Sequence, residues 1–107
     1  MSNSSIGKVL RNLRETKNLL LREVAASISI DPTLLSKIER DERMPTREQV
    51  AALSAFYKEE NSIIVAYLSD KLVSELENER LALEAINAAE KKLKENHSVN
   101  VKRKKKH

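Results

Sequence analysis

The sequence predicts an all-α fold, and three observations support this prediction. The chain has 107 residues but only one Gly and two Pro, which argues against the turn-rich hairpins of sandwiches and barrels. Apolar residues recur at helical spacing in one segment after another. With 40% hydrophobic and 34% charged residues, the chain can build one small core with an appendage. It is too short for most multidomain enzymes.

The first two predicted helices are short and amphipathic. One runs from about residue 4 to residue 17, where Ser4 or Ser5 can cap it. The next is about two turns long and ends near Ser29. Their apolar positions share one face of each helix and are Ile6, Val9, Leu10 and Leu13 in the first, and Leu21, Val24, Ala25 and Ile28 in the second.

The third and fourth helices carry clear start signals. Asp31 is a good N-cap, and Pro32 suits the first helical position because its missing N–H costs nothing there. This helix ends by about Arg40, before the Met-Pro loop. Thr46 and Gln49 form a capping box that opens the fourth helix. The inward residues expected are Leu35 and Ile38 in the third helix, and Val50, Leu53 and either Phe56 or Tyr57 in the fourth.

The second half of the chain reads as a long amphipathic helix. A short apolar segment at 63–68 is followed by helical periodicity to about residue 96. A heptad can be written with Leu72, Glu79, Ile86 and Leu93 at one core position and Leu76, Leu83 and Glu90 at the other. The two glutamates interrupt the seam, so a coiled coil, a dimer contact and packing within the chain all remain open. We expect a domain at 1–68, this helix at 69–97 and a disordered basic tail at 98–107.

Composition argues against several classes of site. The chain has no Cys, which removes disulfides, cysteine zinc sites and thiol nucleophiles and suits a reducing cytoplasm. His97 and His107 lie near the C-terminus without a carboxylate cluster at ligand spacing, so we expect no metal. We find no phosphate-binding Gly loop, no catalytic constellation, no apolar leader and no membrane-spanning segment. We therefore expect a cytoplasmic protein that is no enzyme and needs no cofactor.

Positive charge is concentrated at the two ends of the chain. The net charge is +4. Residues 1–22 contain five Lys or Arg and a single acidic residue, and residues 102–106 are all basic. A polyanion is a reasonable partner for both patches. The tail alone would add affinity that falls with salt and that is independent of sequence.

Two helices joined by a short turn form the most informative pattern. Such helices cross steeply, which requires a small residue at the contact, and Ala25 meets this need. The run NLLLREVAASISIDPTLLSKIERDERMP, followed by TREQVAAL, resembles the XRE-like helix-turn-helix family of phage Cro/CI repressors. The resemblance covers about residues 5–68. It implies a lambda-repressor-like domain of about five short helices, here followed by the long C-terminal helix.

The resemblance also implies roles for individual residues. The N-terminal part of the third helix would enter the major groove, where Thr33 and Lys37 are the best base readers and Ser36 and Pro32 lie beside them. Leu34 would either pack or touch a thymine methyl. Three arginines after the third helix resemble residues that contact the DNA backbone, or could equally be solvated; they are Arg40, Arg43 and Arg47. Arg14 and Glu39 match two positions that form a structural ion pair in many family members.

The chain departs from the family pattern at several positions. A Thr-Gln pair commonly opens the second helix, whereas this chain has Leu20 and Leu21, which remove a side-chain cap and a usual phosphate contact. Phosphate binding there would fall to Arg22 or to backbone N–H groups. At the two turn positions where family members usually have glycine, this chain has Ser29 and Asp41. We therefore expect both turns to use a backbone conformation other than that of glycine, although Asp tolerates the left-handed conformation better than Ser.

We therefore expect double-stranded DNA as the partner of a homodimeric, sequence-specific transcriptional regulator that occupies an operator. It could control restriction-modification genes or act as a mobile-element repressor. The alternative is a protein-interaction module or antitoxin that keeps the fold without base readout. The candidate dimerisation residues are Leu72, Leu76, Leu83, Ile86 and Leu93.

Overall fold

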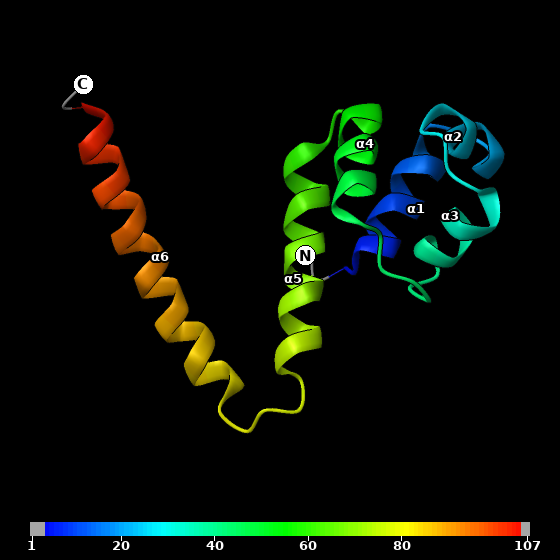
Figure 1. Cartoon of the computed structure of the whole chain (residues 1–107). Coiled ribbons are helices and arrows are strands. Elements are labelled where there is room, and N and C mark those ends of the chain that lie inside the picture. Colours follow the sequence, from blue (N-terminus) through cyan, green and yellow to red (C-terminus); the bar gives the residue numbers. More distant parts are fainter. Residues whose placement is uncertain (1–3, 106–107) are drawn as a thin grey trace. The chain divides into compact units, whose positions relative to one another are not determined.

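The chain folds entirely into helices over the residues that the structure describes. The structure is a computed structural model that describes the backbone of residues 4–105 and the side chains of residues 4–97. Five helices are followed by a longer C-terminal one (Figure 1), as predicted from the sequence. In order, they are α1 (Ile6–Thr16), α2 (Leu21–Ser27), α3 (Pro32–Glu39), α4 (Arg47–Tyr57), α5 (Glu60–Leu76) and α6 (Ala82–Lys105).

One hydrophobic core joins the first five helices. Each helix contributes two or three residues at helical spacing, so the amphipathic patterns of the sequence are used as predicted. Tyr57 is buried and Phe56 only half-buried, which settles the open choice in the fourth helix in favour of Tyr57. Helix α3 packs against both α1 and α2. The buried apolar side chains are Ile6, Leu10, Val24, Ala25, Leu35, Ile38, Val50, Leu53, Tyr57, Ile63, Ala66 and Tyr67.

Three helices begin at the caps that the sequence predicts. Ser5 Oγ accepts a hydrogen bond from the Lys8 N–H at 3.2 Å. Asp31 accepts from the Thr33 N–H at 2.7 Å, directly before Pro32. Thr46 and Gln49 bond to each other's backbone N–H groups, so the predicted capping box is present. These bonds satisfy N–H groups that have no partner inside a helix.

Four helices end with a residue in the left-handed conformation, and none of these residues is glycine. They are Asn18, Ser29, Asp41 and Lys58, with φ between 55° and 61°. At the end of α2, the Ser29 N–H donates to the Ala26 carbonyl and the Ile30 N–H to the Ala25 carbonyl. This is a Schellman motif. The expectation that the turns at Ser29 and Asp41 need another backbone conformation is therefore wrong, because both residues adopt the left-handed conformation that usually favours glycine.

The chain's one glycine, Gly7, serves a close approach between helices instead. A Cβ there would lie 2.6 Å from the Ile38 carbonyl oxygen and 2.8 Å from that of Glu39. The Asp41 carboxylate accepts from the Gly7 N–H at 3.1 Å and also from the Ser5 hydroxyl at 2.6 Å. Asp41 therefore ends α3 and caps α1 at the same time. Such negative charge at a helix N-terminus is favourable.

The prediction of one continuous helix through residues 69–97 is wrong. Helix α5 ends at Leu76, and α6 begins at Ala82. The intervening segment is Glu77, Asn78, Glu79, Arg80 and Leu81, all of them exposed, so no buried apolar side chain anchors this turn, and the heptad had already placed Glu79 at a core position. The heptad therefore does not form one seam.

Two compact units divide the chain, at residues 1–74 and 75–107. The first extends six residues beyond the boundary expected at residue 68. Helix α6 is traced to Lys105, whereas the basic tail predicted at 98–107 lies outside the described side chains and stays a prediction. Among the described residues, we find no helix with the length and apolar character needed to cross a bilayer.

Candidate nucleic-acid interface

Helices α2 and α3 form a compact helix-turn-helix unit. The turn between them runs from Ile28 to Asp31, and both helices bury apolar residues against the core. Ala25 and Val24 have no exposed surface, so the small residue lies where the pattern placed it. Leu35 and Ile38 anchor α3 from behind. The opposite side of α3 faces solvent.

The residues expected to read bases lie on this outward side of α3. Pro32, Thr33 and Lys37 are exposed, and Ser36 is half-buried. Thr33 and Lys37 are four residues apart and therefore stack along one row of the helix. Ser36 and Arg40 form the neighbouring row. Leu34 is half-buried and packs against the core, which agrees with its packing interpretation.

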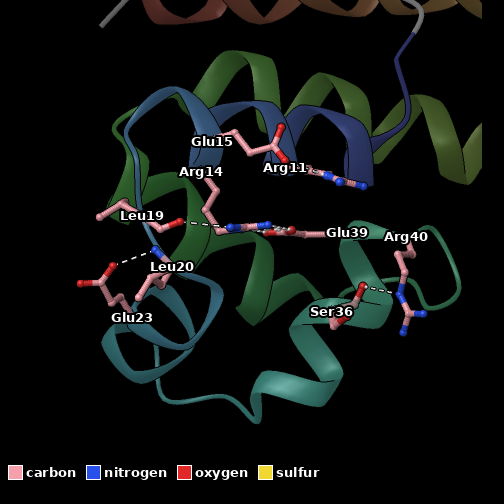
Figure 2. A network of polar contacts seen from close by, with 9 residues as sticks. All are labelled: Arg11, Arg14, Glu15, Leu19, Leu20, Glu23, Ser36, Glu39 and Arg40. Carbon is pink, nitrogen blue, oxygen red and sulfur yellow. Dashed lines mark hydrogen bonds and ion pairs between the residues drawn. The ribbon is translucent and has the colours of Figure 1, made fainter.

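Arg14 and Glu39 lie between α1 and α3 and form a bidentate ion pair (Figure 2). Arg14 Nε lies 2.9 Å from Glu39 Oε2, and Arg14 Nη2 donates to Glu39 Oε1 at 2.9 Å. Arg14 Nη1 also donates to the Leu19 carbonyl at 3.0 Å. The hydrogen bonds that Arg14 donates to Glu39 raise the pKa of Arg14 above its usual value, against the effect of burial. The pair ties α3 to α1 and to the turn before α2.

Tyr57 lies buried within the electrostatic reach of this pair. Burial raises the pKa of Tyr57 to about 12, with a further contribution from the charge of Glu39 and an opposing one from Arg14. Its hydroxyl has no hydrogen-bond partner within the described part of the chain. The neutral phenol is therefore the form that the folded protein favours.

The four arginines expected at the DNA backbone are all exposed. Arg40 Nε donates to the Ser36 carbonyl at 3.3 Å, and its Nη1 lies 3.3 Å from a carboxylate oxygen of Glu42. Arg47 lies at the start of α4, with its guanidinium 6.0 Å from the centroid of the Tyr67 ring. No ion pair is found for Arg22 or Arg43 among the described residues.

The N-terminus of α2 differs from the usual family arrangement, as its sequence indicates. Leu20 occupies the N-cap with 48% of its surface exposed, and its side chain has no acceptor. Only half a capping box forms, since the Glu23 carboxylate accepts from the Leu20 N–H at 2.7 Å (Figure 2). This bond places a negative charge at the start of α2, where the family resemblance implies a phosphate contact.

Sequence reasoning missed Arg11, to which it gave no individual role. Arg11 lies on α1 and shares a hollow of about 210 Å³ with Arg14, Leu21, Ser36, Glu39 and Arg40. Its Nε donates to Glu15 at 3.0 Å, one helical turn away. The concentration of positive charge in residues 1–22 was the only sequence signal for it.

The candidate dimerisation residues belong to two helices. Leu72 and Leu76 lie on α5, whereas Leu83, Ile86 and Leu93 lie on α6. All are exposed except Leu76, which is half-buried. The break between α5 and α6 means that they do not share one helix face.

The described residues contain no group of three or more His, Asp or Glu side chains placed to hold a metal ion.

A comparison with protein families finds a match that covers most of the chain. Residues 7–82 match the model of a helix-turn-helix domain. No curated protein and no solved structure matches the chain significantly. The match runs from the second residue of α1 to the start of α6 and includes the α2–α3 unit with its exposed face. The chain therefore belongs to the helix-turn-helix family of the XRE, or Cro/CI, type, whose members are DNA-binding regulatory domains.

Proposed function

We propose that this protein is a sequence-specific transcriptional regulator that binds an operator as a dimer through α3. The observation that carries this proposal is the outward row of Thr33 and Lys37, on a helix whose other side is fixed by Leu35 and Ile38. A helix held in this way presents a rigid face to the major groove. Lys37 can donate to guanine O6 or N7, and Thr33 can meet a thymine methyl.

Backbone contacts would set the register of this helix in the groove. Four exposed arginines come from α2, from the end of α3, from the loop after it and from the start of α4; they are Arg22, Arg40, Arg43 and Arg47. Guanidinium groups of this kind donate to phosphate oxygens and fix orientation without reading sequence. Arg40 is the strongest candidate for a phosphate contact, because it adjoins the row of Thr33 and Lys37 on the helix surface.

The dimer is supported by the unusual composition of α5. Ile63, Ala66 and Tyr67 face the core, yet the opposite side of the helix is also apolar. A helix that is apolar on all sides is normally buried. A second copy covering this face would place two recognition helices on a two-fold operator. The outward residues of α5 are Val65, Leu68 and Leu72, with Val73 beside them.

Selection from random duplex DNA at near-physiological salt tests this function. The variant is Thr33→Ala/Lys37→Ala, and the matched control is Thr16→Ala/Lys92→Ala, which removes the same two residue types from exposed positions elsewhere. We expect wild type and control to enrich an inverted repeat and the α3 variant to lose it, at about 1–3 kcal/mol per base contact. Binding without any enriched sequence would contradict the proposal.

The position of the enriched repeat identifies the regulated genes. A site upstream of restriction-modification genes would support a controller, and a site within a mobile element would support a repressor of that element. Leu20 favours the second candidate, an interaction module or antitoxin, because a leucine exposed by 48% stands where family members carry a polar cap. That candidate predicts no salt-dependent duplex binding and no effect of the α3 variant.

A further inference from the structure

We propose that the hollow between α1 and α3 is a clamp for one phosphate of the DNA backbone, in which Arg11 and Arg40 both donate hydrogen bonds to that phosphate. This inference rests on the proposed function. It adds a residue of α1 to the interface, in a hollow that Leu21 at the start of α2 also lines.

The charge of the hollow favours an anion. Its lining contains three guanidinium groups and one carboxylate. That carboxylate, Glu39, is fully engaged by Arg14 through three hydrogen bonds. Arg11 and Arg40 at the rim pair only with exposed carboxylates outside the lining, Glu15 and Glu42, and such exposed pairs are weak enough for a phosphate to compete with them. Leu21 forms part of the wall and offers a phosphate no donor.

The hydrogen bonds of both rim arginines leave donors for a ligand. Arg11 uses Nε toward Glu15 in the described structure, so Nη1 and Nη2 are available. Arg40 uses Nε toward the Ser36 carbonyl and Nη1 toward Glu42, so Nη2 is available. Arg11 is thus held at Nε, and Arg40 at Nε and Nη1, while each keeps at least one terminal nitrogen without a partner in the described structure. A guanidinium positioned in this way suits a phosphate oxygen.

The position of the hollow on α3 fits a backbone contact. Ser36 and Arg40 form the row beside Thr33 and Lys37, on the side of α3 that faces α1 (Figure 2). If Thr33 and Lys37 point to bases, this neighbouring row meets the phosphates that border the groove. Ser36 lines the same hollow, and a serine hydroxyl is a donor that suits a phosphate oxygen.

The experiment compares the salt dependence of operator binding among full-length variants. We expect Arg11→Gln to reduce the slope of log K against log salt by about 0.9, the value for one phosphate contact. Lys92→Gln, which removes one exposed cation from α6, should leave the slope unchanged. Arg11→Lys should keep part of the contact, since it keeps the charge and loses the fork. Circular dichroism should show equal folding, because Arg11 is exposed and its pair with Glu15 is local.

A second measurement locates the phosphate. Single neutral methylphosphonates are introduced along the operator, and one position in each half-site should weaken the wild-type protein without further weakening Arg11→Gln. An unchanged slope for Arg11→Gln, or equal methylphosphonate effects in both proteins, would overturn the clamp while leaving the proposed function intact. Arg11-dependent stabilisation of the DNA-free protein by inorganic phosphate, with DNA binding unaffected, would assign the hollow to a free anion and also overturn it. Failure of the wild-type protein to bind any duplex would overturn both proposals.

Discussion

Removing one partner of the Arg14–Glu39 pair should destabilise the domain strongly, and the two single substitutions should differ. Only 4% of the Glu39 side chain is exposed, against 17% for Arg14. Arg14→Met leaves a carboxylate without a counter-ion in the core, which costs about 3–5 kcal/mol. Glu39→Leu leaves a guanidinium that keeps its bond to the Leu19 carbonyl and can turn toward solvent. We expect this second change to cost about 1–3 kcal/mol.

The double variant should recover most of the lost stability. Arg14→Met/Glu39→Leu replaces both charges with apolar side chains of similar volume, and such replacements are often neutral or stabilising. Equilibrium urea unfolding followed by far-ultraviolet circular dichroism measures all four proteins, with equal m-values as the check on two-state behaviour. A double variant as unstable as the sum of the single ones would refute this reasoning, since the pair would then have no coupling energy. Equal effects of the two single substitutions would refute the assigned asymmetry.

Three further predictions concern backbone strain, packing and pH. Ser29→Gly should stabilise the protein by about 0.5–1 kcal/mol, because the φ of 58° at this position favours glycine. Asp41→Gly, at a φ of 61°, should instead destabilise the protein, because it removes the hydrogen bonds that the Asp41 carboxylate accepts from Ser5 and Gly7. Chemical denaturation measures both changes. Gly7→Ala should lower the melting temperature, with a loss of about 1–3 kcal/mol, because the new Cβ would meet two backbone carbonyls of α3. Folding raises the pKa of Tyr57 from 10 to about 12, so the unfolded state loses its proton first and stability should fall by up to about 2 kcal/mol between pH 10 and 12. Tyr57→Phe should remove that part of the alkaline loss in urea unfolding at each pH, and an identical pH profile would contradict the assignment.

The helices could be predicted from the sequence because their signals are local. Asp31 with Pro32, and Thr46 with Gln49, fix the starts of α3 and α4 through hydrogen bonds within one turn. The core followed from apolar spacing for the same reason. The break after Leu76 was missed because the heptad pattern tolerated Glu79 at a core position. A polar residue there removes the apolar contact that would otherwise carry a helix through residues 77–81.

Features that depend on contacts between distant residues could not be read from the sequence. Gly7 looks like an ordinary helical glycine until α3 brings its carbonyls close to it. The hollow that brings Arg11 of α1 and Arg40 at the end of α3 together is equally invisible along the chain. Ser29 was expected to avoid the left-handed conformation on its own propensity, yet the packing of α2 against α3 imposes it.

The same contacts connect the stability of the domain to its proposed recognition of DNA. Glu39 neutralises Arg14 within the hollow and leaves Arg11 and Arg40 as the charges at its rim. If Glu39 were removed alone, the hollow would gain positive charge while α3 lost its link to α1. Non-specific affinity should then rise as discrimination between sequences falls, because phosphate contacts depend on charge and base contacts depend on the orientation of α3. A pair that looks purely structural would in this way decide how much of the binding energy is specific.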